Sequence, residues 1–174
     1  KTITTRLAYL ISIGIDPKSI LTLTFTNKAA TEMRERAFSM LDNSMINTPP
    51  LLCTFHKFGL LFLKFHMSEL GRKNNFIIID TDDKKRILKS FEKEITTSLL
   101  VSEISKYKNS LMTPAEAKAT AQLKLYQDIA DIYEQYEEYI QKNNLVDFDD
   151  LLLLPYKILK DNEKLAEDTS KKYQ

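Results

Sequence analysis

Two stretches of this 174-residue chain share one pattern, and that pattern constrains the fold more than any other feature. Residues 20–36 read ILTLTFTNKAATEMRER, and residues 51–59 read LLCTFHKFG. In each, a short apolar run reaches Thr-Phe and gives way to a helical pattern, as is typical of a buried parallel strand that ends at a sheet edge. Because α/β proteins place ligands at such edges, the pattern predicts an α/β fold with a binding site there.

Composition narrows the fold class and the possible partners. Glycine (3) and proline (5) are scarce, while Leu, Lys, Glu and Ile recur at helical spacings, which predicts a helix-rich fold. A fraction of 43% apolar residues is sufficient for a packed core. The net charge of +1 gives no global field that would attract nucleic acid or an acidic membrane. Any anionic partner must therefore be held locally.

Cysteine usage and hydropathy indicate an intracellular protein. Cys53 is the single cysteine, so an internal disulfide is excluded, and its apolar neighbours predict a small buried side chain. No apolar stretch approaches the roughly 20 residues that cross a bilayer. We expect a soluble, cytoplasmic protein with no membrane partner.

After the second predicted strand, the sequence contains several residues that typically start or end helices. Thr81 is the expected cap of one helix, and Thr113 with Pro114 marks the start of a long helix that fades near residue 143. Asp147 is the expected cap of a last helix, which Pro155 should kink or end.

Polar and aromatic residues occupy both predicted strand ends. They are Thr24, Phe25, Thr26 and Asn27 at the first, and Thr54, Phe55 and His56 at the second. Hydroxyls and flat rings suit single-stranded nucleic acid, which proteins hold through backbone contacts and base stacking. The residue types alone favour a different interpretation, in which Phe25 and Phe55 are core residues and the threonines cap helices.

The sequence contains no complete catalytic set. Three isolated glycines cannot form a phosphate-binding loop, and no apolar strand ends in an Asp-Glu pair that would hold magnesium. Two histidines and one cysteine are too few for a zinc cluster. The run Asp147, Asp149 and Asp150 can hold a metal in principle, but helix capping explains it without one. We expect no catalytic residue, no metal and no ATP hydrolysis in this chain taken alone.

Five segments together resemble the UvrD/Rep family of ATP-dependent DNA helicases, in superfamily 1. Residues 20–36 resemble its motif Ia, and LLCTFHKFGLLFLK at residues 51–64 resembles its motif Ib region. Three further segments resemble other family elements and occur in family order: FIIIDTDDKKRIL, ISKYKNSLMTP and YEEYIQKNNLVDFDDLLLL.

The resemblance implies a fragment that lies between the Walker A motif, before Lys1, and the Walker B motif, after Gln174. The fold is then part of a RecA-like (P-loop NTPase) parallel sheet with an inserted all-α subdomain. Residues 1–70 would begin the motor domain, 71–146 would form the inserted accessory subdomain, and 147–174 would return to the motor domain. Unpaired sheet edges would favour non-native self-association of such a fragment.

The resemblance also implies partners and residue roles. The intact protein would be a helicase of DNA repair that uses ATP and Mg²⁺, with neither bound by this fragment, and moves along single-stranded DNA against a second RecA-like domain. Phe25 would pack on a base, while Thr26 and Asn27 would face the strand and Thr54 and His56 would meet its backbone. Lys1 stands where relatives often place an arginine close to the nucleotide base.

Two alternatives remain open. The chain would instead be the motor part of a helicase-nuclease subunit, or a degenerate helical module that binds nucleic acid or protein. A distal nuclease domain would identify the first, and an intact G-x-G-K-T upstream would exclude the second.

Overall fold

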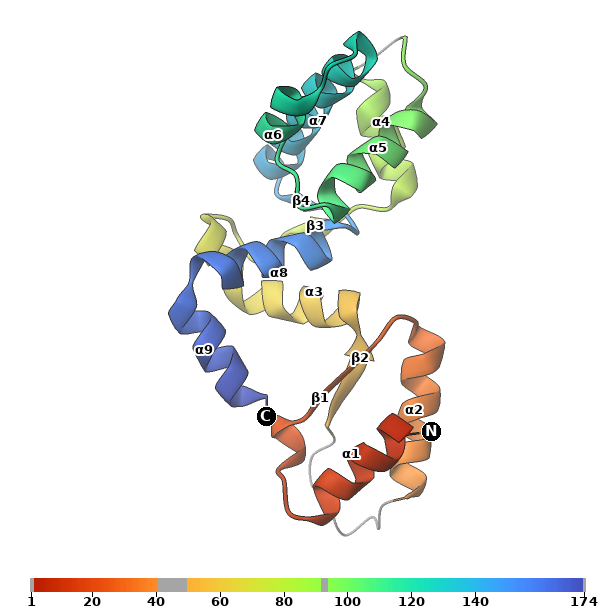
Figure 1. The fold of residues 1–174 in the computed structure, drawn as a ribbon, viewed down its shortest axis with the longest axis vertical. Helices are drawn as coiled ribbons and strands as arrows, with labels where there is room; N and C mark the ends of the chain where they lie inside the picture. Colours follow the sequence, from red (N-terminus) through yellow and green to blue (C-terminus); the bar gives the residue numbers. More distant parts are fainter. Residues whose placement is uncertain (1, 41–49, 92–93, 174) are drawn as a thin grey trace. The chain divides into compact units, whose positions relative to one another are not determined.

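The structure is a computed structural model that describes residues 2–40, 50–91 and 94–173. The chain divides into two compact units, one of residues 1–59 and 159–174 and the other of residues 60–158. Helices dominate both units, and the described strands form two short parallel sheets (Figure 1). The predicted helix-rich α/β class is confirmed. No helix in the described ranges is long and apolar enough to cross a membrane.

The first unit combines a two-stranded sheet with helices. Its elements are α1 (Thr2–Ser12), the 3-10 turn η1 (Pro17–Ser19), β1 (Leu21–Thr24), α2 (Asn27–Ser39), β2 (Leu51–Thr54), the start of α3 (Phe55–His66) and α9 (Glu163–Lys172). Both strands predicted from the repeated pattern are present, and each is followed by its predicted helix. The strand–helix–strand unit therefore forms where local periodicity indicated it.

The core of the first unit lies where α1 and α2 pack beside the sheet. β1 and β2 pair in parallel, with Leu21 opposite Leu51 and Thr24 opposite Thr54. The buried side chains of this cluster are Leu7, Ile11, Ile20, Ala30, Ala37 and Leu52. This register brings the carboxyl ends of the two strands level with each other.

The second unit is mostly helical. After the end of α3 it contains η3 (Met67–Leu70), β3 (Ile77–Ile78), α4 (Thr81–Lys89), α5 (Thr97–Asn109), α6 (Pro114–Thr120), α7 (Lys124–Lys142), β4 (Leu145–Val146) and most of α8 (Asp150–Asp161). Buried side chains of α4, α5, α6 and α7 form most of its core. β3 and β4 pair in parallel although they are far apart in the sequence. The unit boundaries fall inside α3 and α8, and the three-part division at residues 70 and 146 stays a prediction.

Two predicted helix boundaries in this unit are wrong. Asp80, not Thr81, caps α4. The Asp80 carboxylate accepts a hydrogen bond from the Asp83 N–H at 2.8 Å, and the Asp83 carboxylate accepts one from the Asp80 N–H at 3.3 Å. The long helix predicted from Thr113 is two helices, broken after Thr120. The break lets α6 pack against α7, which buries Ala117 in the shared core.

Pro155 does not end α8, contrary to one of the two predicted outcomes. The helix continues through Pro155 to Asp161. A proline removes one backbone donor inside a helix. Leu151, Leu154 and Ile158 are nevertheless buried along the same helix, and this packing is the physical reason that it persists.

Candidate functional site

The two strand ends of the first unit form one continuous edge. Thr24 and Thr54 are register partners at the ends of β1 and β2, and each is followed directly by a phenylalanine. α2 then begins at Asn27, and α3 begins at Phe55. The seven candidate residues, 24–27 and 54–56, therefore lie on adjacent segments of the same unit.

The three threonines hold the backbone of this edge. The Thr26 hydroxyl accepts a hydrogen bond from the Ala29 N–H at 3.1 Å, which caps α2. The Thr54 hydroxyl accepts one from the Lys57 N–H at 3.1 Å in the first turn of α3. Thr24 donates to the Thr26 carbonyl at 3.0 Å. The predicted capping role is confirmed for Thr26 and Thr54, and Thr24 is a buried residue that braces the turn.

Phe25 does not belong to the core. Its side chain is 89% exposed, and its ring centroid lies 5.1 Å from that of the half-buried Phe55 at an interplanar angle of 35°. The interpretation of Phe25 as a core residue is therefore wrong. The hydrogen bonds of Thr24 and Thr26 fix the turn that carries Phe25. The ring points outward from this turn and presents a flat apolar surface to solvent.

Both helices that start at this edge present their positive ends to it. Neither α2 nor α3 has an acidic residue in its first turn, and Lys28 and Lys57 are exposed there. Free N–H groups and the helix dipole favour anions at such positions. Asn27 is exposed and His56 is half-buried at the same helix starts. The sequence interpretation missed both lysines, although lysine in a helix's first turn without a compensating acid is a readable signal.

Cys53 lies one residue before the edge and faces the interior. It is buried, and burial raises the pKa of its thiol above the ordinary value despite the nearby Lys57 and Arg34. The prediction of a small buried side chain is confirmed. A protonated, buried thiol is a poor nucleophile, so Cys53 supplies packing to this region.

The acidic run of the second unit is bound to lysines. The Lys108 ammonium lies 2.7 Å from Asp147, 3.0 Å from Asp150 and 2.6 Å from Glu137. Lys84 lies 3.5 Å from Asp149 and 3.7 Å from Asp147. Across the described ranges, no group of three or more His, Cys, Asp or Glu residues has the geometry of a metal site.

Asp147 also has the capping role predicted for it. Its carboxylate accepts a hydrogen bond from the Asp150 N–H at 2.9 Å, at the start of α8, and another from the Tyr136 hydroxyl at 2.7 Å. Lys108 and Lys84 hold the pKa of Asp147 below its usual value against the effect of burial. Complete burial, with Asp147 and Glu137 nearby, raises the pKa of Asp150 to about 7 despite Lys108.

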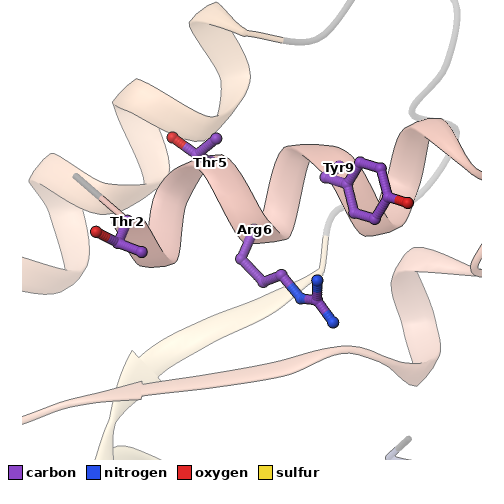
Figure 2. Close-up of a pocket in the computed structure, with 4 residues that line it drawn as sticks. All are labelled: Thr2, Thr5, Arg6 and Tyr9. Atoms are coloured by element: carbon purple, nitrogen blue, oxygen red, sulfur yellow. The ribbon is translucent and has the colours of Figure 1, made fainter.

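Lys1 lies outside the described residues, so its predicted position near a nucleotide base stays a prediction. The helix that follows it lines a cavity of about 640 Å³ with Thr2, Thr5, Arg6 and Tyr9 (Figure 2). The Arg6 guanidinium lies 5.7 Å from the centre of the Tyr9 ring. These groups offer a cation, a phenol and hydroxyls, but no carboxylate that would hold a metal or activate water.

Comparison with known proteins extends the motif resemblance to the whole chain. Residues 1–174 match the UvrD/REP helicase N-terminal domain. The chain is 38% identical over 177 residues to a probable DNA helicase II homolog of Mycoplasma capricolum, covering 95% of this chain and 24% of that protein. It is 36% identical over 172 residues to the ATP-dependent DNA helicase Rep of Escherichia coli, covering 95% and 25%. It is 30% identical over 182 residues to the ATP-dependent DNA helicase PcrA of Staphylococcus aureus, covering 100% and 25%.

The chain spans about a quarter of the length of these curated relatives. The family match nevertheless covers every residue, including both strand ends and the acidic run. The N-terminal domain of this family is RecA-like, which agrees with parallel strands followed by helices. The chain belongs to the UvrD/REP helicase N-terminal domain family.

Proposed function

We propose that this chain is the DNA-gripping part of an ATP-dependent DNA helicase and that the edge formed by residues 24–27 and 54–56 binds single-stranded DNA. The observation that carries the proposal is the exposure of Phe25, which is 89% accessible although it directly follows a strand. Aromatic rings held outward are the usual platforms on which unpaired bases stack. The names of its relatives, which include ATP-dependent DNA helicases, support the same substrate class.

The electrostatics of the edge support contacts to the DNA backbone. Lys28 and Lys57 stand in the first turns of α2 and α3, where the helix dipoles add to their charge. Because the net charge of the chain is only +1, this attraction is local and depends on these groups. Phosphates bind at the helix starts, and the adjacent base packs on Phe25.

The buried hydroxyls act indirectly in this proposal. Thr24 bonds to the Thr26 carbonyl, and Thr54 bonds to the start of α3. They hold the turn that presents Phe25 and Asn27, and thereby position the groups that contact the strand. Thr26, which is exposed, both caps α2 and faces the DNA.

The residues of this chain do not fit a nucleotide phosphate site. Gly14, Gly59 and Gly71 are isolated, so the sequence has no glycine-rich loop whose N–H groups cradle phosphates. We therefore assign ATP and Mg²⁺ to the intact protein, together with a second RecA-like domain, and no step of hydrolysis to residues 1–174. A preparation of residues 1–174 should show no ATP turnover above background.

The test uses the full-length protein. ATP hydrolysis is measured with and without oligo(dT), and strand displacement is measured on a partial duplex with a single-stranded tail. We expect the oligonucleotide to stimulate hydrolysis and ATP to drive displacement. Hydrolysis that is indifferent to single-stranded DNA, together with no displacement, would reject the helicase proposal.

A further inference from the structure

A second basic cavity lies within residues 60–158. It follows the end of α3, has a volume of about 460 Å³, and is lined by Lys64, Phe65, Arg72, Lys73, Asn74 and Asn75 among others. All of these residues belong to the second unit. The cavity is distinct from the strand-end edge, because no residue is shared between the two sets.

Two of the three cations that line this cavity, Lys64 and Lys73, have no carboxylate partner in the described part of the chain. Several lysines of this unit form ion pairs with carboxylates, as Lys84, Lys106 and Lys108 do. Within the described ranges, the exposed Lys73 ammonium has no ion-pair or hydrogen-bond partner, and no described lining residue is acidic. A cation without a local anion beside a cavity attracts an anionic ligand.

Two further cations are fixed in the wall. The Lys64 ammonium lies 4.5 Å from the centre of the Phe76 ring and donates to the Asn74 carbonyl at 3.4 Å. Arg72 donates from Nη2 to the Leu145 carbonyl at 2.7 Å. Burial lowers the pKa of Arg72, although nearby Asp150 and Glu137 oppose the change. Neither Lys64 nor Lys73 pairs with a carboxylate in the described ranges, so these two ammonium groups are the ones that can meet an anionic ligand.

An aromatic ring stands beside these charges. Phe65 is 81% exposed and stacks on no other ring in the described part of the chain. An exposed ring next to lysines without carboxylate partners is the combination that holds single-stranded nucleic acid, in which rings stack on bases and cations meet phosphates. An acidic peptide would satisfy the lysines but would leave Phe65 without a partner.

We propose that this cavity is a second contact for single-stranded DNA, in which Lys73 and Lys64 meet a backbone phosphate and Phe65 stacks on the adjacent base. The choice of DNA rests on the function proposed above. The site itself rests on independent residues in the other unit. The two proposals can therefore be tested separately.

The test compares variants of the full-length protein by binding to fluorescein-labelled oligo(dT) at several salt concentrations. Lys73→Ala should lower the slope of log K against log [salt] by about 0.7, the value for one phosphate contact on a single strand. Phe65→Ala should weaken binding about 5- to 150-fold, the range of one base–aromatic stack. Lys142→Ala and Tyr156→Ala are controls, since both residues are exposed in the same unit and outside the cavity.

The outcomes separate the two proposals. If Lys73→Ala and Phe65→Ala behave like their controls while Phe25→Ala weakens binding, the cavity proposal is wrong and the strand-end proposal stands. If the cavity variants weaken DNA binding and Phe25→Ala does not, the reverse holds. If the cavity variants keep DNA affinity but lose binding to a labelled hexaglutamate peptide, the cavity is a protein site and the proposal is overturned. Melting temperatures identify any variant that has unfolded.

Discussion

Lys108 donates a hydrogen bond from its buried ammonium to Asp147, 2.7 Å away and 39 residues later in the sequence. This bond connects α5 to the turn that begins α8, and the Tyr136 hydroxyl of α7 donates to the same carboxylate oxygen at 2.7 Å. Asp150 accepts a second bond from Lys108 at 3.0 Å. One lysine thus fixes how the acidic run meets the helices of the second unit.

Removal of the Lys108 charge should strongly destabilise the second unit. Lys108→Met leaves Asp147, Asp150 and Glu137 without their shared cation in a buried site, and breaking a buried ion pair in this way typically costs about 3–5 kcal/mol. Urea unfolding followed by near-ultraviolet circular dichroism of tyrosine measures the loss, because most tyrosines lie in this unit.

Lys106→Met is the matched control for this substitution. Lys106 is two residues away on the same helix, its side chain is 68% exposed, and it forms a surface ion pair with Glu103. Such pairs contribute about 0–1 kcal/mol. Equal losses of stability in the two variants would show that the buried network adds nothing beyond a surface pair.

Asp150 should make stability depend on pH in a defined direction. Its pKa is raised to about 7 in the folded protein, whereas an unfolded aspartate titrates near 4. The folded state therefore binds the proton more tightly, and this group's contribution to stability falls as pH rises from about 4 to 7. Asp147, whose pKa is lowered, loses its stabilising contribution only at lower pH.

The comparison of wild type with Asp150→Asn isolates that effect. The stability of the wild type relative to the variant should fall by about 1–3 kcal/mol between pH 5 and pH 8, because other titrating groups cancel in the difference. The measurement is the free energy of unfolding in urea at each pH. A difference that stays constant over this range would contradict a raised pKa at Asp150.

Local sequence signals predicted much of the fold, and distant contacts account for what they missed. β1, β2 and the starts of α2 and α6 follow from periodicity and caps, which depend on near neighbours. β4 is only Leu145–Val146 and exists because it pairs with Ile77–Ile78, far away in the chain. The break after Thr120 likewise depends on the packing of α6 against α7. No local pattern carries such information.

In the acidic run, the sequence predicted the helix cap but not the buried lysines that bind it. Asp147 was predictable as a cap, since its spacing to Asp150 is that of a helix start. The burial of Lys108 and Lys84 was not, because lysine is rarely buried and their neighbours in the sequence are ordinary helix residues. Only the fold brings the two lysines to the carboxylates.

The strand-end edge was predicted in position but not in the disposition of its side chains. The repeated pattern predicted both strand ends, and the residues come together because the two strands pair in parallel register. Residue types alone placed Phe25 in the core, since aromatic residues at strand ends are commonly buried. The outward turn after Thr24 depends on the hydrogen bond of its hydroxyl to the Thr26 carbonyl, which no sequence spacing specifies.

Thr26 should contribute to stability through its role as the cap of α2. Thr26→Ala removes the hydroxyl that accepts from Ala29, and the loss of a helix cap costs about 1 kcal/mol. Thr26→Asn keeps a capping oxygen and should restore most of that stability. The free energy of unfolding of both variants is the measurement. If Asn destabilises as much as Ala, the hydroxyl does not act as a cap.

The most direct test of the proposed function is the affinity of the full-length protein and its Phe25→Ala variant for single-stranded oligo(dT). Phe38→Ala is the control, because Phe38 is a partly exposed phenylalanine on α2 of the same unit. Phe25→Ala should weaken binding by about 1–3 kcal/mol, and Phe38→Ala should leave it nearly unchanged. If Phe25→Ala keeps wild-type affinity and an unchanged melting temperature, the proposal that this edge binds single-stranded DNA is contradicted.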